Sequence, residues 1–261
     1  MKTDLHTLLK TVCEAERACA ELMLEAHDIV SRDKGSARNV VTQYDLKVQE
    51  QLTGLLSASF PSARFFCEET EDTDTLAADE TFVIDPIDGT MNFVHGLRQS
   101  CISVAYLRNG KAVAGAIYNP YADEMFTAIR GEGAFLNDSP IHVSDRGLAE
   151  SVIAVGTAPY NPELWEGTLR LLRTALFSSL DIRRMGSAAL DLCSVAAGRC
   201  GLFCELLLSP WDYAAGALIA EEAGAVCRTI ENTPLPYDRS KPSVVAGGIR
   251  TVEEFFRLYH S

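Results

Sequence analysis

The most informative segment of this 261-residue chain is Phe82-Val83-Ile84-Asp85-Pro86-Ile87-Asp88-Gly89-Thr90. Its hydrophobic first half predicts a buried strand, and Pro86, which cannot donate to a sheet ladder, is expected to end that strand. Asp88 then lies in a turn, and Gly89-Thr90 begins a short helix whose free amide groups suit an anion. The segment thus places two carboxylates beside amides that can hold phosphate. Asp85 and Asp88 could equally be ordinary turn and helix-cap residues.

Two further acids lie at similar boundaries in the predicted secondary structure. Glu68 follows a predicted strand at Phe65-Phe66, and Asp212 begins a predicted helix after Pro210-Trp211. Carboxylates at such positions, in a chain that already has an excess of acids, are costly unless cations compensate them. The four acids therefore predict a site for divalent cations that prefer oxygen ligands.

The charge balance limits the candidate partners. The chain has 36 Asp and Glu residues against 23 Lys and Arg residues, and its formal net charge of -13 disfavours binding to nucleic acid or anionic membranes.

Its apolar runs are shorter than the roughly 20 residues that span a bilayer, and no secretory signal is visible. The eight cysteines include no Cys-x-x-Cys pair. We therefore expect the cysteines to act as small hydrophobic residues buried in the core. We expect a cytoplasmic protein.

The first part of the chain is expected to contain helices followed by an antiparallel meander. Apolar residues at spacings of three and four predict a helix from Leu5 to Val30 and a second from Tyr44 to Ser57. Polar residues 31–39 between them are expected to form a loop, either solvated or facing a phosphate. Strands are expected at 81–84, at 101–108 and 111–118 around the turn Asn109-Gly110, and at 125–130 and 134–136.

After about residue 144, predicted strands and helices alternate. Strands are expected at 152–155, 181–185 and 202–205, and helices after Asn161-Pro162 and over 187–197 and 211–223. Thr251 and Glu254 fit a capping box at the start of a C-terminal helix. We therefore expect an N-terminal α+β part, residues 1–144, and a C-terminal α/β part, residues 145–261, which form one functional unit with the site between them.

Four segments together resemble the inositol monophosphatase family of magnesium-dependent, lithium-sensitive phosphomonoesterases, and the bacterial members most closely. They are Glu68-Glu69 and residues 85–93, 184–192 and 210–216, in the order and at the spacing of the family. The resemblance covers essentially the whole chain. It implies a mixed α+β and α/β fold, a layered αβαβα sandwich, and a homodimer.

The resemblance also implies two or three Mg2+ ions. Glu68, Asp85 and the backbone carbonyl of Ile87 would hold the ion that activates water. Asp85, Asp88 and Asp212 would hold a second ion near the leaving oxygen, and Glu68 would help to bind a third, weaker one. Two such ions support the attacking and departing oxygens of an in-line displacement, without a covalent intermediate.

Further roles follow from the same resemblance. Thr90 would position the attacking water, and Asp45 would accept the proton or hydrogen bond of the Thr90 hydroxyl. Asp45 could instead be only a helix-start residue favoured by the helix dipole. The amides of Gly89 and Thr90 would hold phosphate oxygens. The alcohol of the substrate would contact Asp88, Glu205 and the backbone near Gly186, Ser187 and Ala188, although Glu205 could also be an exposed acid at a strand end.

Three departures from the family pattern remove no metal ligand. Cys67 replaces a usual Gly, Met91 a common Thr, and Cys200 a frequent Asp. Cys67 leaves the local backbone geometry open, because a side chain now stands where there is usually none. Cys200 leaves open how closely the substrate edge matches that of inositol-specific members.

The expected activity is hydrolysis of a small phosphate monoester, with myo-inositol monophosphate as the first candidate. Fructose 1,6-bisphosphate is an alternative if Arg183 and Arg184 bind a second phosphate, as are other sugar or nucleotide phosphates. A non-catalytic metal-binding regulator would be expected to lack a ligand, whereas Glu68, Asp85, Asp88 and Asp212 are all present.

Overall fold

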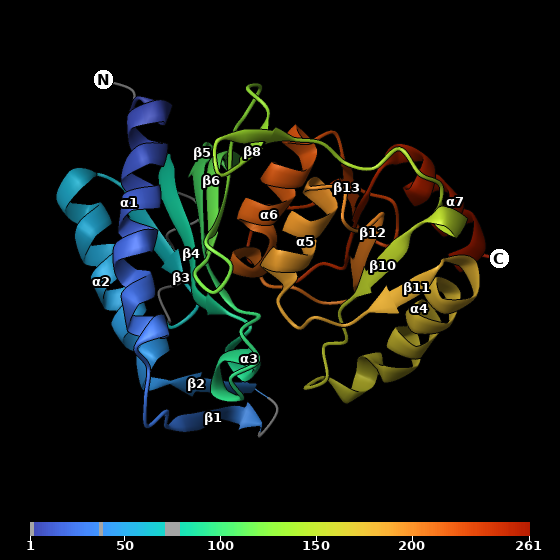
Figure 1. Cartoon of the computed structure of the whole chain (residues 1–261), viewed down its shortest axis with the longest axis horizontal. Coiled ribbons are helices and arrows are strands. Elements are labelled where there is room, and N and C mark those ends of the chain that lie inside the picture. Colours follow the sequence, from blue (N-terminus) through green and yellow to red (C-terminus); the bar gives the residue numbers. More distant parts are fainter. Residues whose placement is uncertain (1–2, 37–38, 71–78) are drawn as a thin grey trace.

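Five layers of secondary structure stack in the order helix, sheet, helix, sheet, helix (Figure 1). The structure is a computed structural model that describes residues 3–36, 39–70 and 79–261. The predicted αβαβα sandwich is confirmed, and the structure bears out the mixed α and β composition. In the described part of the chain, no helix combines the length and apolar character needed to cross a membrane.

The first sheet has seven strands in the order β3-β4-β5-β6-β7-β8-β9. They are β3 (Arg64–Cys67), β4 (Glu80–Asp88), β5 (Cys101–Arg108), β6 (Lys111–Asn119), β7 (Glu124–Ile129), β8 (Ala134–Leu136) and β9 (Ser139–Ile141). Neighbours pair antiparallel, as the predicted meander requires, except that β3 is parallel to β4. Helices α1 (Leu5–Leu24) and α2 (Gln43–Ser59) cover its outer face (Figure 1).

The second sheet has five strands in the order β11-β10-β12-β14-β13. They are β10 (Val152–Val155), β11 (Asp181–Arg183), β12 (Leu202–Glu205), β13 (Val226–Arg228) and β14 (Val244–Gly247). Helices α5 (Ala188–Ala196) and α6 (Pro210–Glu222) lie between the two sheets, and α4 (Trp165–Ser178) and α7 (Ile249–Tyr259) cover the far side (Figure 1). Short helices are α3 (Thr90–Val94), η2 (Leu148–Glu150) and η3 (Pro162–Leu164).

Close packing joins the middle helices to the first sheet. Helix α6 presents several alanines to the core, and Gly115 of β6 lies against one of them. A Cβ added to Gly115 would lie 3.3 Å from the Cα of Ala215. The small residues at this contact therefore let α6 approach the sheet closely, which fixes the position of the α6 N-terminus.

Two expectations for the N-terminal region were wrong. Helix α1 ends at Leu24 and not at Val30, and the backbone turns into the left-handed region at Asp28, with φ of 48°. Residues 31–36, expected to be a loop, form strand β1 (Ser31–Ser36), which pairs antiparallel with β2 (Asn39–Thr42). Residues 37–38 of the expected loop lie outside the described residues.

Strand β4 does not end before Pro86. It continues to Asp88 through an irregularity, because Asp85 pairs with Ser103 whereas Asp88 pairs with Cys101. Two residues of β4, Pro86 and Ile87, thus lie opposite one residue of β5, Ile102. A bulge of this kind accommodates a proline, since the extra residue makes no ladder hydrogen bond, and it redirects the side chains that follow.

The predicted capping box at Thr251 and Glu254 is also wrong. The N-cap of α7 is Gly248, three residues before Thr251, so both side chains lie inside the helix. The Thr251 hydroxyl donates to the carbonyl of Arg146 at 2.7 Å, and a Glu254 oxygen accepts from the amide of Leu148 at 2.7 Å. These two side chains bind α7 to the segment around η2 and do not cap the helix.

The outer layer offers a direct test of the packing. Leu52 and Leu46 both belong to α2, but Leu52 is 0% exposed whereas Leu46 is 51% exposed. Leu52→Ala is expected to lower the free energy of unfolding by about 2–5 kcal/mol, because it leaves a cavity in the core. Leu46→Ala makes the same change in the same helix, and it should cost only about 0.5 kcal/mol. Urea unfolding of both variants measures the difference, and equal losses would contradict this packing.

Candidate active site

Three carboxylates converge at one end of the first sheet. Asp85 and Asp88 come from the irregular end of β4, and Asp212 comes from the first turn of α6. One carboxylate oxygen from each lies within 4.8 Å of the others. Asp85 and Asp88 are buried, and Asp212 is half-buried. All three line a cavity of about 330 Å³.

Each of the three side chains is fixed by a backbone amide. Asp85 Oδ1 accepts from the amide of Ile87 at 3.0 Å, and Asp212 Oδ2 accepts from the amide of Ser209 at 2.6 Å. Asp88 Oδ2 accepts from the amide of Ala189 at 2.9 Å and from the Ser187 hydroxyl. Asp88 therefore joins the first sheet to the N-terminus of α5.

The gathering of these acids changes their titration. Burial, followed by repulsion from Glu68, Asp88 and Asp212, holds the pKa of Asp85 well above its usual range. Burial, followed by repulsion from Glu68 and Asp88, does the same for the pKa of Asp212. Burial raises the pKa of Asp88 to about 6, against the hydrogen bonds from Ser187 and Ala189, which lower it. A bound cation would relieve this repulsion.

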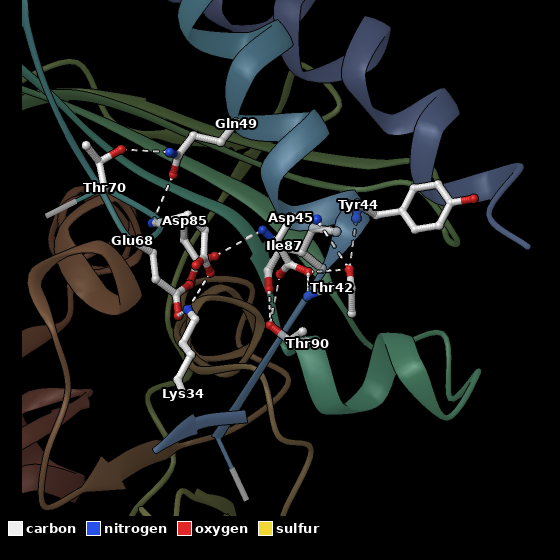
Figure 2. Close-up of polar contacts among 11 residues, drawn as sticks. Lys34, Thr42, Tyr44, Asp45, Gln49, Glu68, Thr70, Asp85, Ile87 and Thr90 are labelled. Atoms are coloured by element: carbon white, nitrogen blue, oxygen red, sulfur yellow. Dashed lines mark hydrogen bonds and ion pairs between the residues drawn. The ribbon is translucent and has the colours of Figure 1, made fainter. Parts of the chain in front are cut away.

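Glu68 faces the same cavity and is paired with a lysine. Lys34 Nζ lies 2.9 Å from Glu68 Oε1 and also contacts Glu69, and Figure 2 shows the lysine side chain reaching up to Glu68 beside Asp85. Burial and then repulsion from Glu68 raise the pKa of Glu69 to about 7. The basic segment at residues 31–36 therefore faces the acidic site, with Lys34 as a cation among its carboxylates.

Thr90 and Asp45 lie together beside this cluster (Figure 2). The Thr90 hydroxyl is 3.2 Å from Asp45 Oδ1 and 3.1 Å from the carbonyl of Ile87, both possible acceptors. Asp45 Oδ2 accepts from the amide of Thr42 at 2.8 Å, and the amide of Asp45 donates to the Thr42 hydroxyl at 3.3 Å, which together form a capping box for α2. Asp45 thus combines the two alternatives considered from the sequence. It lies at the start of a helix, and it also contacts Thr90.

Gly89 allows α3 to begin at this point. Its φ is 84°, and an added Cβ would lie 2.8 Å from the carbonyl oxygen of Gln99. A side chain here would meet both backbone strain and a clash. Gly89 and Thr90 both line the cavity.

The residues predicted to bind the alcohol all line this cavity: Asp88, Gly186, Ser187, Ala188 and Glu205. Glu205 ends β12, and its Oε1 accepts from the amide of Ala158 at 3.0 Å. Burial raises the pKa of Glu205 to about 7. A Cβ on Gly156 would lie 1.9 Å from Glu205 Oε2, so the glycine makes room for this carboxylate.

Among the polar residues that line the cavity, Tyr160, Asp191 and Lys241 received no role from the sequence. Lys34, which also lines it, was expected only as part of a loop that is either solvated or facing a phosphate. Asp191 lies four residues after Ser187, one helical turn on, and this spacing could have revealed it. Tyr160 and Lys241 lie in irregular segments with no pattern to mark them. Of the two arginines proposed for a second phosphate, Arg184 lines the cavity, whereas Arg183 pairs with Asp181 at the surface.

Two of the departures from the family pattern can be placed. Cys67 is buried in β3 opposite Ile84, within an ordinary strand pairing. It is not among the described residues with a left-handed backbone, so the side chain causes no local distortion of that kind. Cys200 is half-buried, and burial followed by the charge of Asp191 raises the pKa of its thiol to about 11.

Comparisons with known proteins give a consistent result over the length of the chain. The model of the inositol monophosphatase family matches residues 4–256. The inositol-1-monophosphatase of Rhizobium meliloti is 38% identical over 248 residues, 93% of this chain and 91% of that protein. Nus factor SuhB of Pasteurella multocida is 37% identical over 226 residues, 85% of each. The crystal structure of extragenic suppressor protein suhB from Bartonella henselae matches with a TM-score of 0.90 at 35% identity and covers 97% of this chain and 98% of that chain.

The raised pKa values predict the pH dependence of stability. Between the ordinary aspartate pKa of about 4 and the folded-state pKa of about 6 for Asp88, the folded protein binds protons that the unfolded chain releases. The free energy of unfolding of metal-free protein should therefore fall as the pH rises through this range. Urea unfolding at several pH values measures the slope.

Asp88→Asn should flatten this slope, because it removes one of the repelling charges. Asp145→Asn, an exposed aspartate outside the cavity, is the matched control and should leave the slope unchanged. A steeper fall in the Asp88 variant would show that its carboxylate is not a source of repulsion.

Proposed function

Because the chain belongs to the inositol monophosphatase family, we propose that it hydrolyses a small phosphate monoester with Mg2+ as cofactor. The observation that carries the proposal is the convergence of Asp85, Asp88 and Asp212 in one cavity with Thr90 and Glu205. Acids that would hold a cation, a hydroxyl that would orient water, and an acid that would bind an alcohol thus face the same space. The first candidate substrate is myo-inositol monophosphate.

The donor set fits a hard divalent cation. Three carboxylates from β4 and α6 lie within 4.8 Å of one another, and the oxygen ligands they offer are those that Mg2+ prefers. Asp88 accepts from Ser187 and Ala189 at Oδ2, and Asp212 accepts from Ser209 at Oδ2, so these bonds orient both carboxylates for a cation. Glu68 and the carbonyl of Ile87 would supply further ligands, enough for two or three ions. Bound Mg2+ supplies an activated water and neutralises charge on the phosphate and its leaving oxygen.

The residues of the chain have separate tasks in this proposal. Thr90 holds the attacking water, and Asp45, fixed by Thr42, accepts the hydrogen bond of the Thr90 hydroxyl. The amides of Gly89 and Thr90 at the start of α3 bind phosphate oxygens. Glu205 accepts hydrogen bonds from substrate hydroxyls, since a carboxylate can bridge two of them. Lys34 compensates Glu68 and Glu69 before the cations bind.

One observation favours a second substrate. Arg184 and Lys241 both line the cavity and could bind a second phosphate, as a sugar bisphosphate such as fructose 1,6-bisphosphate would require. Rates with inositol 1-phosphate, fructose 1,6-bisphosphate and a nucleotide phosphate, all at one Mg2+ concentration, distinguish the candidates.

We propose a homodimer as well, as the family resemblance implies. Helix α4 supports it, because it exposes Leu169, Leu176 and Phe177 to solvent. Light scattering on the purified protein gives the oligomeric state directly.

The first test is phosphate release from inositol 1-phosphate with Mg2+ and with excess EDTA. Activity should require Mg2+. Asp85→Asn should reduce kcat by about a thousand-fold or more, because bound ions contribute several kcal/mol to stabilisation of the transition state. Asp145→Asn is again the control. Full Mg2+-dependent activity of the Asp85 variant would refute the proposed role of this residue, and an unchanged rate in EDTA would refute the need for a metal.

The second test concerns Thr90. Thr90→Ala should lower kcat by about 10²- to 10⁴-fold, because water would lose the group that positions it. Thr90→Ser keeps the hydroxyl and should retain most of the activity. Calorimetric titration with Mg2+ should give similar affinities for both variants. If Ala and Ser variants had equal rates, the hydroxyl would have no part in the reaction.

A further inference from the structure

Asp191 lies in α5, one turn after the N-cap Ser187, and its side chain lines the cavity. It is 2% exposed. Residues four apart on a helix share a face, so Asp191 is on the side of α5 that carries Ser187, whose hydroxyl donates to Asp88. The carboxylate is therefore placed in the site by the same helix that fixes Asp88.

This carboxylate has no partner within the described part of the chain. No described residue donates a hydrogen bond to it or forms an ion pair with it. Burial, followed by repulsion from Asp88 and Glu205, holds its pKa well above the usual range. A buried polar group without a partner costs free energy, and native structures generally satisfy such groups. A cavity-lining carboxyl that the protein leaves unsatisfied is available to a ligand.

The surroundings of Asp191 indicate the chemistry of that ligand. The charges that act on it are those of Asp88, Glu205 and Arg184. Arg184 is held in place, since Nε and Nη2 lie 3.2 and 3.1 Å from the Thr157 hydroxyl, and a Cβ on Gly186 would lie 2.2 Å from its Nη1. Glu205 is held by the amide of Ala158. Around Asp191, the cavity thus combines the carboxylates of Asp88 and Glu205 with the guanidinium of Arg184. Carboxylates accept and a guanidinium donates hydrogen bonds, so these groups together suit a ligand with several hydroxyls.

We propose that Asp191 is a specificity residue that forms a hydrogen bond with a hydroxyl of the substrate alcohol, in addition to the contacts of Glu205. A hydroxyl both donates and accepts, so it can pair with Asp191 in either protonation state. The substrate class is then a phosphate ester of a polyol or sugar, and not of a simple aryl alcohol. This inference rests on the proposed phosphatase function.

The test compares two esters with the Mg2+-loaded enzyme: inositol 1-phosphate and phenyl phosphate, whose alcohol has no further hydroxyl. Asp191→Ala should lower kcat/KM for inositol 1-phosphate by about 10- to 100-fold, the effect of leaving a buried substrate hydroxyl without its hydrogen-bond partner. The loss should appear mainly in KM. Values for phenyl phosphate and inhibition by inorganic phosphate should not change.

Two further variants separate recognition from a structural role. Asp191→Asn keeps the shape and one acceptor oxygen, so it should fold as the wild type does and reduce the preference less than Asp191→Ala. Ser194→Ala is the matched control on the same helix, because the Ser194 hydroxyl donates to the Leu190 carbonyl and does not line the cavity. It should leave the ratio of the two kcat/KM values unchanged.

The outcomes distinguish this inference from the function on which it rests. If the wild type hydrolyses neither ester with Mg2+, the proposed function is wrong and the role of Asp191 in it falls as well. If the wild type is active and the Asp191 variants change both esters equally, or change neither, the function stands and the specificity role is overturned.

Discussion

Repulsion among Asp85, Asp88 and Asp212 is the constraint to which the rest of the site conforms. Carboxylates less than 5 Å apart repel one another, and each of these three is held in place by a backbone amide. Two of these amides belong to the starts of α5 and α6, where the helix dipole also favours negative charge. The irregular end of β4, the two helix starts and the small residues beneath α6 all serve to keep these acids in one place. The proposed cation would offset the electrostatic cost that remains.

Local sequence patterns were sufficient to predict many of the helices and strands. The strands around Asn109-Gly110, helix α2 and the two middle helices follow from periodicity and turn residues. The wrong predictions arose where hydrophobic pattern does not reveal the pairing. Residues 31–36 have no alternating apolar pattern, yet they form β1, which pairs with the neighbouring β2, and Lys34 in this strand contacts the distant residues Glu68 and Glu69. A proline such as Pro86 is expected to end a regular strand, but the bulge in β4 accommodates it. The sequence alone does not reveal that bulge.

The site was predictable to a similar extent. Acids at strand ends and helix starts indicated a cation site, but their convergence from positions 85, 88 and 212 was expected only from the family resemblance. Asp191 was missed because an acid in a helix is usually solvent-exposed, and only the packed structure shows its burial. Tyr160 and Lys241 reach the cavity from irregular segments, whose path depends on tertiary packing.

The origin of the two sets of groups has a consequence for evolution. The acids proposed for the cation come from β4 and α6, whereas the groups proposed to face the alcohol come mainly from β12, from α5 and from the segment near Ala158. Substitutions among the groups proposed to face the alcohol can alter which alcohol fits, while the acids proposed for the cation stay unchanged. A duplicated gene with this scaffold can therefore acquire a new substrate through a few substitutions and keep its chemistry throughout.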